Sequence, residues 1–225
     1  MGKRSVLVIA VSALALLSFF LVLNIKKIGL PRSLKTGASV SSLSNQASAL
    51  EASGNLLEAK AIYQRLLNDL PGAKEVASWQ KKVEELNIKI LFSSVVTSKC
   101  ALYTIKPGDS LVKIARDFKT TPELIMKSNN ISGDKIYVGR KIRVYNAPFN
   151  ILVDKSQNIL ILKSDEEVVK SYIVSTGANN STPLGVFKIV NKLPNPTWFK
   201  AGAVVAPGSP ENILGSRWLG LSIPR

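Results

Sequence analysis

The segment from Tyr103 to Tyr145 constrains the fold of this chain more than any other part, because it carries the signals of a complete strand-helix-helix-strand module. A short strand is expected to enter a turn at residues 106–109, where Pro and Gly suit a tight reversal. Ser110 has the position of a helix N-cap, and apolar residues recur after it at helical spacing. A second turn at residues 120–122 opens another short helix, and a second strand ends at Tyr145.

Three short motifs follow one another in this segment: Gly-Asp-Ser-Leu after the first strand, Ser-Asn-Asn-Ile after the second helix, and Ile-Tyr-Val-Gly before the last strand. With them, the whole segment resembles the LysM domain. The resemblance implies a ligand that contains N-acetylglucosamine, as in peptidoglycan or chitin, held in a shallow groove between the strand-helix loop and the helix-strand loop. On this sequence, the groove would be lined by Gly108, Asp109, Ser110 and Leu111 on one side and by Asn130, Ile131, Ser132 and Ile136 on the other.

The chemistry of these residues suits an N-acetyl sugar, whose amide and hydroxyl groups need polar partners and whose methyl group needs an apolar floor. A plainer interpretation is also open. Gly108 and Asp109 would then only shape a turn, while Leu111 and Ile136 would belong to the core.

An uncharged apolar run from Ser5 to Leu23 lies behind the basic residues Lys3 and Arg4. The run is long enough to cross a bilayer as a helix. A signal peptide would have a shorter apolar core and a small-residue cleavage site, so we expect a retained membrane anchor over residues 1–27. A buried core helix is the weaker alternative.

The chain has a net charge of +15, which raises the possibility of nucleic-acid binding. Its Lys and Arg residues are spread along the sequence, and no nucleic-acid motif accompanies them. Anionic lipid headgroups, stem-peptide carboxylates and acidic wall polymers are alternative partners for a basic protein at a bacterial wall. We therefore expect no nucleic-acid partner.

Two segments separate the apolar run from the LysM-like module. Residues 28–44 are expected to form a flexible spacer, because Ser, Gly and Thr are frequent there. Residues 45–92 are expected to form a helical hairpin, with a turn at Gly54, and this hairpin resembles a single tetratricopeptide repeat. It could recruit a protein partner or serve only as a helical spacer.

After Tyr145 the pattern changes to β-strands, and a series of motifs follows. They are Ser-Thr-Gly at 175–177, Thr-Pro-Leu-Gly-Val-Phe at 182–187, Pro-Thr-Trp at 196–198 and Leu-Gly-Ser-Arg at 214–217. From residue 149 onward the chain resembles the L,D-transpeptidase catalytic domain. That resemblance implies a Cys thiolate that attacks a tetrapeptide stem, forms a thioester and passes the acyl group to an amine.

The catalytic residues of that chemistry are not assigned to any position here. In the family, a His-Gly and a Ser-x-Gly-Cys-x-Arg segment follow the Leu-Gly-x-Arg strand, and this sequence ends at Arg225 before either. Cys100 lies outside the domain and the sequence has no histidine, so we expect Cys100 to be a free thiol of no catalytic role; pairing between two chains is the alternative. We also expect no metal site and no cofactor. We expect the chain to be a fragment; a natural truncation is the alternative.

The predicted fold is a multi-domain α+β protein with an N-terminal transmembrane helix, a tetratricopeptide-like helical hairpin, a βααβ LysM module and a partial, mostly β, L,D-transpeptidase domain. The last two are placed at 101–146 and 149–225. The predicted function is that of a single-pass membrane protein facing the periplasm or wall, which binds peptidoglycan glycan and crosslinks its peptide stems. The alternative is a non-catalytic wall-binding or scaffold protein.

Overall fold

A computed structural model describes residues 6–10 and 37–222 of the 225-residue chain. The described residues form two compact units. The first contains residues 6–10, 148–165 and 172–222, and the second contains residues 37–147 together with the short segment 166–171.

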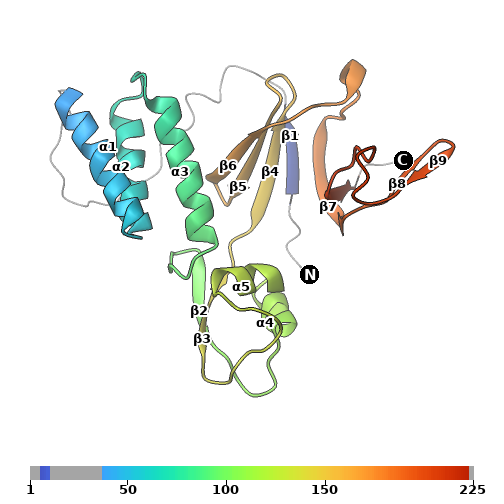
Figure 1. Ribbon diagram of the computed structural model, residues 1–225, viewed down its shortest axis with the longest axis horizontal. Coiled ribbons are helices and arrows are strands. Elements are labelled where there is room, and N and C mark those ends of the chain that lie inside the picture. Colours follow the sequence, from blue (N-terminus) through green and yellow to red (C-terminus); the bar gives the residue numbers. More distant parts are fainter. Residues whose placement is uncertain (1–5, 11–36, 223–225) are drawn as a thin grey trace. The chain divides into compact units, whose positions relative to one another are not determined.

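Three helices form the N-terminal part of the second unit, and they run side by side in Figure 1: α1 (Gly37–Ala52), α2 (Leu56–Asp69) and α3 (Val76–Leu91). They bury a common apolar core that contains Ala47, Ala59, Tyr63, Leu66, Trp79 and Leu86. Helix α1 begins at Gly37, within the segment expected to be a flexible spacer. The Ser-rich composition concealed an apolar stripe, because Val40, Leu43 and Leu50 pack against the same core.

The LysM-like module follows, with β2 (Cys100–Thr104), α4 (Leu111–Asp117), α5 (Pro122–Ser128) and β3 (Lys141–Tyr145). Strands β2 and β3 pair antiparallel, from Cys100 opposite Tyr145 to Thr104 opposite Lys141. Both helices have capped N-termini: the Ser110 hydroxyl accepts from the backbone N–H of Lys113, and the Thr121 hydroxyl accepts from that of Leu124. The module therefore begins its first helix at the N-cap that the sequence predicts.

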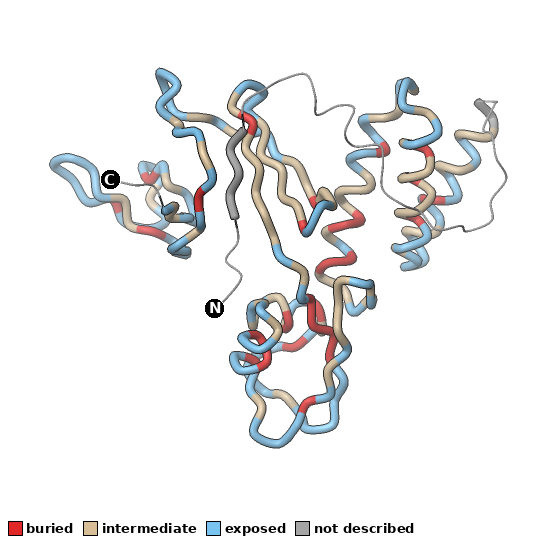
Figure 2. The backbone as a smooth tube through the Cα atoms, turned by 180° about the vertical axis from the view of Figure 1, so that it is seen from behind, coloured by how far each residue is buried: buried red, intermediate tan, exposed pale blue. Residues whose placement is uncertain are grey.

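A continuous apolar core supports this module. Its buried members are Ile105, Leu111, Ile114, Ala115, Ile125, Ile131, Ile142 and Val144. Four of the five residues of β3 are buried, and Figure 2 shows a red stretch in this module, with the exposed loops in pale blue at the far end. The loops therefore project from a packed base.

The strands of the C-terminal region are β4 (Phe149–Asp154), β5 (Ile159–Ser164), β6 (Glu167–Ile173), β7 (Gly185–Pro194), β8 (Trp198–Lys200), β9 (Ala203–Val205) and β10 (Arg217–Leu221). A short 3₁₀ helix, η2 (Ala178–Asn180), precedes β7. Strands β8 and β9 form a separate hairpin, and the main sheet has the order β10-β7-β1-β4-β5-β6.

The predicted transmembrane helix is wrong. Residues Val6–Ala10 form strand β1, which pairs in parallel with β4 and antiparallel with β7. A run of β-branched and other apolar residues fits a central strand as well as a membrane helix, and its periodicity alone does not separate the two. The rest of the predicted anchor, residues 1–5 and 11–27, lies outside the described residues, as do residues 28–36 of the predicted spacer. Among the residues that the structure describes, no helix combines the length and the apolar character needed to cross a membrane.

Candidate functional site

The strand-helix loop of the LysM-like module is held by the side chain of Asp109. One carboxylate oxygen of Asp109 accepts from the Tyr103 hydroxyl at 2.7 Å and from the backbone N–H of Lys106 at 2.8 Å. The other oxygen lies 3.5 Å from the ammonium group of Lys113. Gly108 has φ 79°, a left-handed conformation that favours glycine. The loop is therefore fixed from within and exposes its backbone at Gly108.

These contacts shift two pKa values in opposite directions. The backbone N–H of Lys106, followed by the Tyr103 hydroxyl, lowers the pKa of Asp109. The hydrogen bond to Asp109 raises the pKa of Tyr103. At neutral pH the loop therefore contains an ionised carboxylate and a neutral phenol.

The helix-strand loop is held by Asn129, which follows α5. Its side-chain amide donates to the carbonyl oxygens of Ile125 at 2.8 Å and Arg143 at 2.7 Å, and its side-chain oxygen accepts from the backbone N–H of Arg143 at 2.7 Å. The next residue, Asn130, has φ 51° and turns the chain away from the helix. One amide side chain thus ties the start of this loop to both α5 and β3.

The eight predicted groove residues divide by exposure. Gly108, Ser110, Asn130 and Ser132 are exposed, and Asp109 and Ile136 are half-buried. Leu111 and Ile131 are 6% and 8% exposed and belong to the core. The structure therefore places polar groups of both loops at the surface, above apolar side chains that support them.

Three further residues lie at these loops and escaped the sequence analysis. Asn129 is one; the Ser-Asn-Asn-Ile motif indicated the loop but not which amide holds it. The other two are Tyr137, which is 65% exposed, and Arg140, whose guanidinium donates to the carbonyl oxygen of Asn129 at 3.1 Å. The sequence signal that could have identified Tyr137 and Arg140 was the presence of an aromatic residue and an arginine within one short loop.

A small cavity of about 200 Å³ lies elsewhere in the same unit. The ammonium groups of Lys60 and Lys99, which line it, both contact the carboxylate of Glu167. The side-chain amide of Asn87 donates to the carbonyl oxygen of Val168 at 2.9 Å, and the hydroxyl of Ser171 donates to Glu84 at 2.6 Å. These bonds hold segment 166–171 against helix α3.

The C-terminal unit has its own ordered loops. The backbone N–H of Gly177 donates to the Thr182 hydroxyl at 2.7 Å, and the ammonium group of Lys155 donates to the carbonyl oxygens of Asn180 and Thr182. Asn212, which is buried, donates to the carbonyl oxygens of Pro196 and Ala206. Trp198 is half-buried and Trp218 is 44% exposed. These residues shape the loops around β7 and β10.

Cys100, at the start of β2, is half-buried and lies 3.3 Å from the Thr97 hydroxyl. The sequence contains no histidine to activate it. Within the described residues, no group of His, Cys, Asp and Glu side chains is arranged to hold a metal ion.

Comparison with known proteins gives two domain matches: the LysM domain matches residues 103–144, and the L,D-transpeptidase catalytic domain matches residues 148–220. The putative L,D-transpeptidase YkuD of Bacillus licheniformis is 32% identical over 129 residues, which cover 54% of this chain and 70% of that protein. The chain belongs to the L,D-transpeptidase family. The putative L,D-transpeptidase YkuD of Bacillus subtilis strain 168 is 29% identical over 127 residues, covering 53% of this chain and 69% of the relative.

This L,D-transpeptidase belongs to an acyltransferase-type enzyme family and also carries a LysM domain, which is a peptidoglycan-binding domain. The combination is that of an extracytoplasmic cell-wall protein. A third relative, the cell wall-binding protein YocH of Bacillus subtilis strain 168, is 39% identical over 74 residues, covering 32% of this chain and 26% of the relative.

Proposed function

We propose that the LysM domain binds the N-acetylglucosamine-containing glycan of peptidoglycan and holds an L,D-transpeptidase on its substrate. The proposed groove lies between Gly108–Ser110 and Asn130–Ser132, with Leu111, Ile131 and Ile136 as its apolar support. Binding to the glycan keeps the peptide stems at a high local concentration around the attached catalytic domain. The helical hairpin and the two following domains would occupy residues 45–92, 101–146 and 149–225.

The observation that carries this proposal is the fixation of both loops by side chains of the module itself. Asp109 holds one loop and Asn129 holds the other. The exposed residues of the two loops are small or polar: Gly108, Ser110, Asn130 and Ser132. A rigid pair of loops loses little conformational entropy when a sugar binds. Exposed backbone amides and short polar side chains are suitable partners for the N-acetyl and hydroxyl groups of the sugar.

The proposed reaction is acyl transfer between peptide stems through a thioester. A cysteine thiolate would attack the amide of a tetrapeptide stem, releasing the terminal residue with its amino group protonated. An amine of a neighbouring stem would then displace the thiolate and form the crosslink. Neither the nucleophile nor its histidine is assigned to a residue of this sequence, since Cys100 lies outside the transpeptidase domain.

Glycan binding is tested by sedimenting the protein with purified peptidoglycan and by competition with N-acetylglucosamine oligomers. The informative variant is Gly108→Val, which places a branched side chain at the exposed loop and is expected to reduce binding by about tenfold or more, because one clash of about 1.4 kcal/mol is a factor of ten. If Gly108→Val binds like the wild type, the groove is wrongly placed.

Gly54→Val provides a matched control. Gly54 has φ 85° against 79° for Gly108, and a side chain at either position would meet no atom within 4 Å. Both substitutions therefore strain the backbone similarly, but Gly54 lies in the turn between α1 and α2. Only Gly108→Val is expected to lose glycan binding.

A non-catalytic wall-binding protein is the second candidate, favoured by the similarity to the cell wall-binding protein YocH. The two candidates agree on glycan binding. They differ in acyl transfer, which is followed by mass spectrometry of crosslinked stems.

A further inference from the structure

The LysM domain carries a group of basic residues around its two loop turns: Lys106, Lys135, Arg140 and Lys141, all exposed. Backbone hydrogen bonds bring three of them together. The N–H of Ile105 donates to the carbonyl oxygen of Arg140 at 3.0 Å, and the N–H of Gly139 donates to that of Ile105 at 2.8 Å. Both bonds involve Ile105, the residue before Lys106. They therefore place Lys106 near Arg140 and Lys141.

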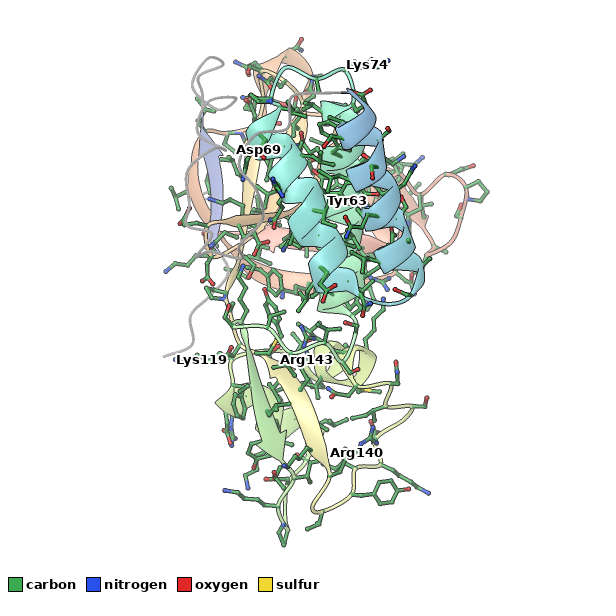
Figure 3. All side chains as sticks on the ribbon, turned by 90° about the vertical axis from the view of Figure 1, so that its left-hand side faces the viewer. Tyr63, Asp69, Lys74, Lys119, Arg140 and Arg143 are labelled. Atoms are coloured by element: carbon green, nitrogen blue, oxygen red, sulfur yellow. The ribbon has the colours of Figure 1, made fainter. Side chains whose placement is uncertain are left out.

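Arg140 is the most defined of these cations. One nitrogen of its guanidinium donates to the carbonyl oxygen of Asn129 at 3.1 Å, so the side chain lies against the residue that begins the helix-strand loop. Figure 3 shows Arg140 toward the loop end of the domain and Arg143 toward the helices. A guanidinium that is already held by one bond loses less side-chain entropy when it binds a ligand.

The charge on this side of the domain is not neutralised by the protein. In the described part of the chain, none of Lys106, Lys135, Arg140 and Lys141 forms an ion pair, whereas on helix α4 Lys113 pairs with Asp109 and Arg116 pairs with Asp117. Asp134 is the acidic residue in the 132–136 loop, and it is exposed. The cations thus exceed the carboxylates around the loops.

Tyr137 adds a second kind of contact at the same turn. Tyr137 is 65% exposed, and its backbone carbonyl oxygen accepts from the backbone N–H of Arg140 at 3.1 Å. The turn therefore presents two kinds of group: an exposed aromatic residue suits stacking on a sugar face, and the guanidinium of Arg140 suits a carboxylate.

We propose that Arg140, assisted by Lys106, makes this LysM domain selective for glycan strands whose peptide stems carry ionised carboxylates, over neutral chitin chains. The inference rests on the proposed glycan binding and adds the charge of the ligand to it. The neutral sugar occupies the groove, while a stem carboxylate lies beside the guanidinium of Arg140.

The test compares Arg140→Gln and Lys106→Gln with the wild-type chain on two ligands, purified peptidoglycan freed of acidic wall polymers and chitin oligomers. Each variant is expected to lose about fivefold in affinity for peptidoglycan, the effect of one exposed ion pair, and to bind chitin within twofold of the wild type. Coupling the stem carboxylates to a neutral amine should lower wild-type binding to the level of the variants.

Arg116→Gln is the matched control, because it removes an exposed cation of the same domain that is already paired with Asp117. It is expected to bind both ligands like the wild type. Arg140→Gln also removes the hydrogen bond from the guanidinium to the carbonyl oxygen of Asn129, so this variant could disturb the loop. Lys106→Gln does not remove that bond, and it therefore tests the charge independently.

Three results would overturn the proposal: an equal loss on peptidoglycan and chitin, no effect of blocking the carboxylates, or a charge preference seen only while acidic polymers remain on the wall. The last result would assign the cations to a phosphate-containing polymer. If the wild type binds neither peptidoglycan nor chitin, the proposed groove itself fails, which is a distinct outcome.

Discussion

At the scale of single residues, Asp109 holds the strand-helix loop of the LysM domain. Replacing it with Asn removes the negative charge that accepts from Tyr103 and Lys106. Because the folded pKa lies below the ordinary value of 3.8, this stabilisation is fully present above pH 3.8 and is lost as the pH falls through the folded pKa. Wild type should therefore melt at a higher temperature than Asp109→Asn at pH 7, with the difference decreasing as the pH falls below 3.8. Thermal unfolding followed by circular dichroism across this pH range measures the difference, and a difference independent of pH would contradict the prediction.

Asn129 has the corresponding role in the second loop. Asn129→Ala leaves the backbone N–H and C=O of Arg143 without their side-chain partner, and each unsatisfied buried group costs about 1–3 kcal/mol. We expect a loss of about 2 kcal/mol in the free energy of unfolding, measured in urea, together with weaker glycan binding. Asn130→Gly is the control for stability alone, because glycine accepts the φ of 51° at this exposed position and Asn130 itself belongs to the proposed groove. A wild-type urea midpoint for Asn129→Ala would show that the loop is held by other contacts.

At the scale of elements, Arg143 connects β3 to the C-terminus of α3. It is 2% exposed, and one guanidinium nitrogen donates to the carbonyl oxygen of Leu91 at 2.9 Å, while the other two make no hydrogen bond within the described part of the chain. Desolvation of an incompletely bonded cation offsets the benefit of that bond. Arg143→Met should thus change the free energy of unfolding by less than about 1.5 kcal/mol, and Arg143→Ala should cost about 2–4 kcal/mol through the cavity it leaves. Equal, large losses in both variants would instead show that the charge itself stabilises the domain.

Segment 166–171 provides a second test at this scale, through the contact of Lys60 with Glu167. Burial alone would raise the pKa of Glu167, but the ammonium groups of Lys60 and Lys99 lower it below 4.5. The ion pairs therefore stabilise the fold above pH 4.5 and weaken as the pH falls through the folded pKa. A double-mutant cycle of Lys60→Met and Glu167→Gln should give a coupling energy of about 0.5–1 kcal/mol at pH 7, which decreases as the pH falls below 4.5. A coupling energy that does not change with pH would exclude an ion pair as its source.

Local signals in the sequence were more informative than composition. The N-cap at Ser110 was predictable because a hydroxyl before an apolar helical repeat has one common role, and the structure confirms it. The hydrogen bonds of Asn129 and Arg140 could not be predicted from the sequence. They join residues that are 11–14 positions apart, and they depend on how α5 packs against β3. Composition misled at the N-terminus, where Val6–Ala10, part of an apolar run that suits a membrane helix, form a strand between β4 and β7.

At the scale of the whole molecule, glycan binding and acyl transfer should separate in this chain. We expect the 225 residues to sediment with peptidoglycan but to form no crosslinked product from disaccharide-tetrapeptide substrates, because the sequence has one cysteine and no histidine to activate it. Mass spectrometry of the reaction mixture detects the crosslinked dimer directly.

Cys100→Ser should leave glycan binding unchanged. The thiol lies at the start of β2, and within the described structure its one side-chain hydrogen-bond partner is Thr97. A dimer that appears with the wild type and disappears with Cys100→Ser would make Cys100 a nucleophile and contradict the expectation that this thiol has no catalytic role. A dimer that persists in Cys100→Ser would require a different nucleophile, and with it a different reaction from the thioester exchange proposed for the family.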